Sequence, residues 1–165
     1  MHPRWRIDRD RRISVRLIER SDAPNLSDFY ASLSPESRRR RFLGHVAGDD
    51  GALADRLTEH AGEGLVAILA EASPRDGLIV GHATVQRDGP GTAEIALAVA
   101  DEFRGLGIGG RLMVAATRHA RQLGMHRLNA LMYADNTPMR HLLRATGPVL
   151  SDEIDAGVEE MSVAV

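Results

Sequence analysis

The sequence contains no cysteine and no lysine among its 165 residues. Without cysteine, the chain cannot form disulfides, bind a metal through thiolates, or pass a reacting group through a cysteine nucleophile. All 21 basic residues are therefore arginines. This pattern is typical of a GC-rich genome, and it would also leave an enzyme that modifies lysine with no target on its own chain.

The sequence also has no long apolar run. No stretch approaches the roughly 20 apolar residues that are needed to cross a bilayer. The N-terminal residues 1–12 are basic but are followed by no apolar segment, so they do not resemble a secretory signal. The hydrophobic fraction of 43% and charged fraction of 27% are typical of a globular protein. We expect a cytoplasmic protein with a basic arm over residues 1–12 and a single domain over residues 13–165.

Several catalytic and binding motifs are missing. There is no Gly-x-Ser-x-Gly motif, which argues against a hydrolase, and no Gly-Lys-Ser/Thr, which excludes a Walker-type phosphate loop. The seven histidines show no spacing of paired metal ligands, so no metal site is expected. His82, in an apolar segment that is predicted to be a strand, is the histidine to test as a substrate-site residue.

Periodicity, capping residues and turn residues predict a mixed order of strands and helices. Strands are expected at 13–19, 65–71, 78–86, 92–100, 127–134 and 158–165, and a short additional strand is possible near 148–151. Helices are expected over 22–33, from 34, from 49 or 50, over 107–123 and from 136 to about 147. Antiparallel strands precede a single βαβ crossover, which predicts an α+β fold with a mixed, mostly antiparallel sheet flanked by helices.

A glycine-rich loop at residues 104–110 fits two phosphate-binding patterns. The spacing Gly105-x-Gly107-x-x-Gly110 is that of a dinucleotide-binding turn, and Asp135 lies at the end of the next strand, where a ribose-binding carboxylate would sit. The spacing Arg104-x-x-Gly107-x-Gly109 is that of a loop that holds the pyrophosphate of an acyl-coenzyme A. Four residues separate the preceding strand from Gly105, and only 55 follow Gly110. Both observations favour the acyl-coenzyme A loop.

Two segments then carry a family resemblance. Residues 93–109, Ala-Glu-Ile-Ala-Leu-Ala-Val-Ala-Asp-Glu-Phe-Arg-Gly-Leu-Gly-Ile-Gly, resemble the GNAT acetyltransferase superfamily, whose loop motif is Gln/Arg-x-x-Gly-x-Gly/Ala. A second motif of that family is matched by Asn136, Met139, Leu142 and Gly147. With the strand order, the resemblance covers residues 13–165. The segment Leu33-Ser-Pro-Glu-Ser-Arg-Arg-Arg-Arg-Phe42 is also similar to one found in Pat-type bacterial protein lysine acetyltransferase domains.

The resemblance implies that acetyl-CoA lies in a splayed cleft between the fourth and fifth strands, with no metal. Residues 97–99 would lie beside the pantetheine and residues 105–110 at the pyrophosphate, with Asn136 on the other side. The residues that it implies for cofactor binding are Leu97, Ala98, Val99, Arg104, Gly105, Leu106, Gly107, Ile108, Gly109, Gly110 and Asn136.

The resemblance also implies catalytic roles. Glu94, a lone carboxylate in an apolar strand, would be the general base, and burial there would raise its pKa. The backbone N–H of Val99 or of a neighbour would polarise the thioester carbonyl. Many family members have a tyrosine seven residues after the asparagine as proton donor, but this chain has Leu143 there. Tyr133 would replace it only if it faces the cleft.

The predicted function is direct transfer of an acetyl group from acetyl-CoA to a primary amine, with a protein lysine as first choice. A small-molecule amine, such as an antibiotic or a polyamine, and a catalytically silent acyl-CoA-sensing module are the alternatives. The run Arg38–Arg41 has few aromatic residues nearby, so nucleic-acid binding is less expected than a solvated helix face, an acidic protein contact or a CoA phosphate contact. The sequence is compatible with a monomer or a homodimer.

Overall fold

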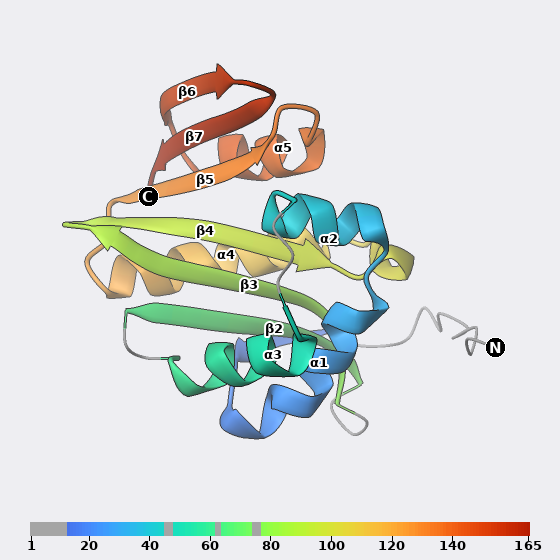
Figure 1. Ribbon diagram of the computed structural model, residues 1–165. Coiled ribbons are helices and arrows are strands. Elements are labelled where there is room, and N and C mark those ends of the chain that lie inside the picture. Colours follow the sequence, from blue (N-terminus) through green and yellow to red (C-terminus); the bar gives the residue numbers. More distant parts are fainter. Residues whose placement is uncertain (1–12, 45–47, 62–63, 74–76) are drawn as a thin grey trace.

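A seven-stranded sheet with the strand order β1-β2-β3-β4-β5-β7-β6 forms the frame of the protein (Figure 1). The structure is a computed structural model that describes residues 13–44, 48–61, 64–73 and 77–165. The predicted arm at residues 1–12 lies outside the described residues. The strands are β1 (Ser14–Leu17), β2 (Leu65–Ser73), β3 (Leu78–Gly89), β4 (Thr92–Val99), β5 (Arg127–Tyr133), β6 (Val149–Asp155) and β7 (Val158–Ala164).

The helices occur where capping and spacing predicted them. They are α1 (Ala23–Ser32), α2 (Pro35–Phe42), α3 (Asp50–Glu59), α4 (Ile108–Gln122) and α5 (Thr137–Thr146), with short 3-10 turns η1 (Arg20–Asp22) and η2 (Asp101–Phe103). Ser34 caps α2, since its side chain accepts a hydrogen bond from the Ser37 N–H, and Asn136 caps α5 in the same way. Helix α4 differs from α2 and α5, because its N-cap residue is Gly107, which provides no side-chain cap.

The sheet is mixed, as predicted. Every pair of neighbouring strands is antiparallel except β4 and β5, which are parallel. This single parallel pair confirms the α+β class and is unlike the doubly wound sheet that binds dinucleotides. The last hairpin is longer than expected: β6 extends to Asp155 because the chain reverses tightly at Ala156 and Gly157, both with positive φ.

Helices cover both faces of the sheet and create two hydrophobic cores (Figure 1). On one face, α4 buries Ile108 and Leu112 against β2, β3 and β4, and Leu143 of α5 belongs to the same core. On the other face, α1 and α3 bury Leu26, Tyr30 and Leu53 against the N-terminal half of the sheet. The core residues of β4 alternate: Ala93 and Ile95 face α4, and Ala98 faces α1 and α3.

Candidate active site

The sheet opens between β4 and β5. The two strands pair at three positions: Thr92 with Arg127, Ala93 with Leu128 and Glu94 with Asn129. Beyond these positions β4 remains paired with β3, and β5 remains paired with β7 along its length. The strands therefore diverge beyond Glu94 and Asn129, which forms the splayed opening that was expected between the fourth and fifth strands (Figure 1).

The divergence exposes backbone groups of β4. The Ala100 N–H donates to the Val80 carbonyl at 2.9 Å, so Ala100 points its backbone toward β3. Backbone direction alternates along a strand, so Leu97 and Val99 point toward the opening. Because β5 has moved away from these positions, their N–H and C=O groups have no strand partner there. An extended ligand can occupy the place of the missing strand.

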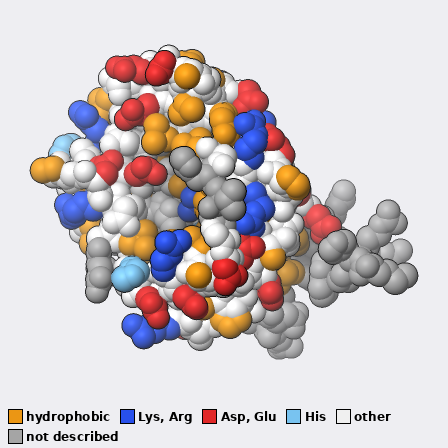
Figure 2. Space-filling model, in the orientation of Figure 1, with side chains coloured by type: hydrophobic (Ala, Val, Ile, Leu, Met, Phe, Trp, Pro, Cys, Tyr) orange, Lys and Arg blue, Asp and Glu red, His pale blue; other side chains and the backbone are white. Residues whose placement is uncertain are grey.

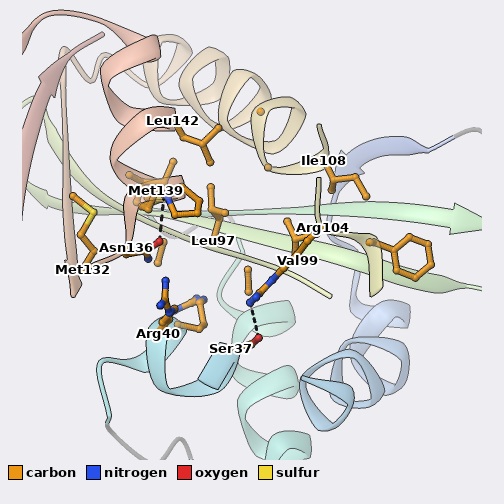
Figure 3. Close-up of a pocket in the computed structure, with 18 of the residues that line it drawn as sticks. Ser37, Arg40, Leu97, Val99, Arg104, Ile108, Met132, Asn136, Met139 and Leu142 are labelled. Atoms are coloured by element: carbon orange, nitrogen blue, oxygen red, sulfur yellow. Dashed lines mark hydrogen bonds between the residues drawn. The ribbon is translucent and has the colours of Figure 1, made fainter. Parts of the chain in front are cut away.

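A cavity of about 440 Å³ occupies this opening and extends to the start of α4 (Figure 3). Ten of the eleven residues predicted to bind the cofactor line it: Leu97, Ala98, Val99, Arg104, Gly105, Gly107, Ile108, Gly109, Gly110 and Asn136. Leu106 does not line it and is 55% exposed. The loop turns the Leu106 side chain outward, so any contribution of this residue to binding would come from its backbone.

The start of α4 is suited to an anion. Gly107 has a φ of 76° and offers no side-chain cap, and the first backbone bond of the helix is Arg111 N–H to the Gly107 carbonyl at 3.1 Å. The N–H groups of Ile108, Gly109 and Gly110 therefore have no acceptor within the helix. With no acidic residue in the first turn and the positive end of the helix dipole at this point, these N–H groups can bind a phosphate.

The glycines of the loop serve different purposes. Gly105 and Gly107 have φ values of 75° and 76°, and an added Cβ would meet no atom within 4 Å at either position. Glycine is thus required at both for its backbone conformation. At Gly109, a Cβ would lie 3.2 Å from Leu142 Cδ1, so this glycine lets α4 and α5 approach each other closely.

A polar network joins the loop to α2. The Asp101 carboxylate accepts hydrogen bonds from the Ser34 N–H at 3.0 Å and from the Ser37 hydroxyl at 2.6 Å. Arg104 donates to the Ser37 hydroxyl at 2.6 Å and forms an ion pair with Asp101 at 3.3 Å (Figure 3). Burial acts to raise the pKa of Asp101, but the serine hydrogen bonds and the Arg104 charge outweigh it and lower the pKa. The two serines of the segment Leu33–Phe42 therefore dock α2 onto the loop.

Helix α2 supplies residues of the cavity that the sequence did not assign to it. Ser37, Arg40 and Arg41 line the cavity from this side. Further lining residues that were not predicted are Ile95, Ala96, Phe103, Leu131, Met132, Pro138, Met139 and Leu142. The arginine run was visible in the sequence, but its contact with the cleft depends on the docking of α2, which is a long-range contact with no local pattern.

Asn136 lies on the wall of the cavity opposite Arg104 (Figure 3). Its side-chain oxygen accepts a hydrogen bond from the Met139 N–H at 3.3 Å, which fixes the start of α5. Its neighbour Asp135, the carboxylate that the dinucleotide pattern required, does not line the cavity. The Asp135 side chain is 65% exposed and lies 3.6 Å from the Arg40 guanidinium.

Glu94 lies at the vertex of the opening, but it is exposed. The expectation that this carboxylate is buried was wrong, because Glu94 points to the sheet face opposite Ala93 and Ile95, and no helix covers that face at this position. Glu94 is in register with Gln86 on one side and with Asn129 on the other. It adjoins Ile95 and Ala96, which line the cavity, without lining it itself.

Leu143 and Tyr133 were the two positions considered for a proton donor, and neither supplies a donor group to the cavity. Leu143 is fully buried in the core against α4. Tyr133 does not line the cavity, and the Arg39 guanidinium lies 4.0 Å from the centre of its ring. Tyr133 was expected to replace the missing tyrosine only if it faces the cleft. It does not line the cavity, so this condition is not met.

His82, the histidine singled out for a test as a substrate-site residue, does not line the cavity. It is fully buried, and its Nδ1 shares a hydrogen bond of 2.7 Å with the Tyr30 hydroxyl. Burial, and to a lesser extent the charge of Arg41, lowers the pKa of His82 to about 3. The imidazole is therefore neutral near pH 7 and belongs to the core beneath α1.

The described residues contain neither a metal-binding cluster nor a membrane-spanning helix. Among residues 13–44, 48–61, 64–73 and 77–165, no group of three histidine, aspartate or glutamate side chains is arranged to hold a metal ion. In the same part of the chain, no helix has the length and apolar character needed to cross a bilayer.

Comparison with known proteins identifies the family. Residues 26–147 match the model of the Acetyltransferase (GNAT) family. The chain belongs to this family. The prediction of a GNAT-type acetyltransferase is thereby confirmed. Among curated GNAT relatives, acetyltransferase PA5475 of Pseudomonas aeruginosa is 29% identical over 145 residues, which cover 86% of this chain and 77% of that protein.

Other GNAT relatives include Pat proteins. Acetyltransferase Pat of Mycolicibacterium smegmatis is 36% identical over 91 residues, which are 54% of this chain and 27% of that protein. The match thus spans about a quarter of that relative. The crystal structure of the GNAT domain of S. lividans PAT has a TM-score of 0.76 at 25% identity, covering 92% of this chain and 89% of that one.

A GNAT superfamily phosphinothricin acetyltransferase from Sinorhizobium meliloti, solved in complex with AcCoA, has a TM-score of 0.75 at 18% identity. The match covers 93% of this chain and 88% of that one. At this identity the likeness shows the fold, and the fold is the GNAT fold that the sequence predicted.

Proposed function

We propose that this protein transfers an acetyl group from acetyl-CoA directly to a primary amine. One observation carries the proposal: the opening between β4 and β5 runs from a carboxylate at its vertex to an uncapped helix N-terminus at its far end. A ligand that combines a pyrophosphate with a long, partly polar arm matches both ends. Acetyl-CoA has this construction, and its thioester would come to lie toward the vertex.

Each part of the cofactor has a counterpart in the cavity. The pyrophosphate would accept hydrogen bonds from the N–H groups of residues 108–110, with the Arg104 guanidinium nearby. The pantetheine amides would pair with the backbone of Leu97 and Val99 in the place of a missing strand. The apolar side chains of Met139 and Leu142 would cover the methylene groups of the arm.

The chemistry requires a neutral amine. A lysine side chain with an ordinary pKa near 10.4 is mostly charged at pH 7, so a base must remove a proton before the nitrogen attacks the thioester carbon. Glu94 is the carboxylate at the vertex and is accessible to an incoming amine. The backbone N–H of Val99 would stabilise the oxyanion of the tetrahedral intermediate. With leucine at position 143, the CoA thiolate would leave as an anion and take a proton from solvent.

A protein lysine is the acceptor that we propose. The support comes from the Pat relatives and from the docking of α2, because the serines of the Pat-like segment are the ones that bind Asp101. Since the match spans about a quarter of the mycobacterial Pat protein, what that whole protein does is not transferred here.

The proposal is tested by measuring CoA release with a panel of acceptors: lysine peptides, an acyl-CoA synthetase, polyamines and aminoglycosides. Release with the peptides or the synthetase, located by mass spectrometry at a lysine side chain, is the expected result. If CoA is released only with polyamines or aminoglycosides, the acceptor is a small-molecule amine and not a protein lysine. Acetyl-CoA binding in calorimetry without release from any acceptor would contradict catalysis and favour an acyl-CoA-sensing module.

A further inference from the structure

Helix α2 presents four consecutive arginines beside the cleft, and one of them differs from the others. Three have a carboxylate partner within the chain: Arg38 with Asp50 at 2.8 Å, Arg39 with Glu36 at 3.2 Å and Arg40 with Glu36 at 2.6 Å. Arg41 forms no ion pair with any residue in the described part of the chain. Its positive charge is therefore not balanced by a neighbouring carboxylate there.

Arg41 lines the cavity and is only partly satisfied. One terminal nitrogen donates to the Thr84 hydroxyl at 3.2 Å, and the guanidinium carbon lies 5.1 Å from the centre of the Phe42 ring. Its Nε is buried and has no hydrogen-bond partner. A guanidinium stays charged at any physiological pH, and a buried donor without an acceptor costs free energy. The guanidinium thus brings to the cavity a positive charge that no carboxylate in the described residues balances.

The register of the sheet locates Arg41 relative to the proposed base. The Thr84 hydroxyl of β3 accepts a hydrogen bond from Arg41, and Thr84 lies opposite Ala96 of β4. Two residues further along β3, on the same face of the sheet, Gln86 lies opposite Glu94. Two residues along a strand span about 7 Å. Arg41 and Glu94 therefore flank the same side of the opening at neighbouring levels. An amine that reaches Glu94 brings the groups next to it close to Arg41.

The charges around the opening are of both signs. Acidic side chains gather over β6 and β7 at the top of Figure 2. Glu153 of β6 and Glu160 of β7 are both exposed. The phosphates of a cofactor have their own partners at Arg104 and at the start of α4, so they do not require Arg41. Arg41 is therefore available to bind a different anion, at the end of the cavity where acetyl transfer would take place.

We propose that Arg41 binds a carboxylate of the acceptor, so that the preferred acceptor is a protein lysine with an aspartate or glutamate beside it in the sequence. This inference rests on the proposed function and specifies its substrate. The guanidinium is charged and planar, and the terminal nitrogen that does not bind Thr84 can donate to a carboxylate oxygen. Arg38, Arg39 and Arg40 differ in that each has a carboxylate partner within the chain.

The test uses blocked eleven-residue peptides with one central lysine and otherwise neutral residues. In turn, one glutamate is placed at −2, −1, +1 or +2 from the lysine, and each peptide has a counterpart with glutamine at that position. The enzyme forms are wild type, Arg41→Gln, Arg41→Lys and Arg39→Gln. Arg39 lies outside the cavity and serves as the matched control, since it removes one charge from the same helix. Thermal unfolding and acetyl-CoA calorimetry check that each variant is folded.

Wild type is expected to favour at least one glutamate peptide over its glutamine counterpart by about tenfold in kcat/KM, which is the scale of one charge-assisted hydrogen bond. Arg41→Gln should abolish this preference, so that the ratio of the kcat/KM values for the two peptides falls to about one. Arg41→Lys, which keeps the charge but loses the planar guanidinium, should retain part of it, and Arg39→Gln should retain all of it.

The alternatives give different results. Equal rates on glutamate and glutamine peptides with wild type would overturn the inference and leave lysine acetylation intact. An equal fall on both peptides in Arg41→Gln would overturn it too, and would assign Arg41 to the thioester or the leaving thiolate. If no peptide or protein lysine is acetylated, the proposed acceptor is wrong and the inference is rejected with it.

Discussion

Glu94 and Asn129 are the last residues of β4 and β5 that lie opposite each other before the strands separate. The Asn129 amide is held from both sides, since it donates to Asp88 at 2.7 Å and accepts from the Ser162 hydroxyl at 2.7 Å. These bonds close the sheet at the vertex and leave Glu94 beside it with no ion-pair partner in the described part of the chain. The opening therefore ends at a carboxylate that is free to accept a proton.

Replacing this carboxylate tests its role as a base. Glu94→Gln keeps the size of the side chain but cannot take up a proton, so we expect kcat/KM for acetyl transfer near pH 7 to fall by at least about tenfold. Acetyl-CoA affinity in calorimetry should not change, because Glu94 does not line the cavity. Glu153→Gln, a change on the exposed strand β6, is the control and should leave kcat unchanged. Equal kinetics for Glu94→Gln and wild type would remove Glu94 from the mechanism.

The loop glycines give a second prediction, with Gly124, just beyond the C-terminal end of α4, as the control. Gly107 and Gly124 have nearly the same φ, 76° and 77°, and a Cβ at either position would meet no atom within 4 Å. Alanine at either position therefore introduces similar backbone strain, of about 1–2 kcal/mol. Only Gly107 lies in the cavity, at the N-terminal end of α4.

Gly107→Ala should weaken acetyl-CoA binding by about tenfold, because relief of the strain would turn N–H groups away from the pyrophosphate. Gly124→Ala should bind acetyl-CoA like wild type although it loses similar stability. Calorimetric titration of both variants measures the difference. Equal affinities would mean that the start of α4 does not bind the pyrophosphate.

Local patterns predicted most of the fold. Strand alternation, the caps at Ser34 and Asn136, and the glycines of the loop are short-range features, and they set element boundaries to within a few residues. The cleft followed from the family resemblance, and the pairing of β4 with β5 at three positions confirms it. Ten residues implied by the resemblance line one cavity.

Long-range contacts were not predictable in the same way. The apolar sequence around Glu94 indicated burial, but exposure depends on which helices cover each face of the sheet, and no helix covers this position. His82 lies in a strand beside the cleft, yet α1 packs over it through Tyr30. The docking of α2 depends on Asp101, which is separated from Ser34 by 67 residues.

Two arginines of α5 offer a test of stability that is independent of catalysis. Arg140 forms an ion pair with Glu159, whose side chain is fully buried, whereas Arg144 pairs with Asp152 at 3.1 Å near the surface. Arg140→Met would leave a buried carboxylate without its partner and should lower the free energy of unfolding by about 3–5 kcal/mol. Arg144→Met should lower it by less than about 1 kcal/mol. Urea unfolding of both variants checks this, and similar losses would contradict the difference in burial.

The buried His82 predicts how stability depends on pH. Its pKa is about 3 in the folded protein and near 6.5 when exposed, so between these values the unfolded state binds the additional proton. The contribution of His82 is therefore complete above pH 6.5 and is lost as the pH falls toward 3, by up to about 1.4 kcal/mol per pH unit.

His82→Asn removes this titration and retains an acceptor for the Tyr30 hydroxyl, which His82 binds through Nδ1. The variant should be less stable than wild type at pH 7, because it leaves a small cavity, but its free energy of unfolding should fall less steeply between pH 6.5 and 4.5. His141 is exposed, so His141→Asn should keep the slope of wild type. Urea unfolding at several pH values in this range measures the three slopes. Parallel curves for His82→Asn and wild type would mean that His82 takes up its proton equally well in the folded and unfolded states, which the burial of its ring beneath Tyr30 argues against.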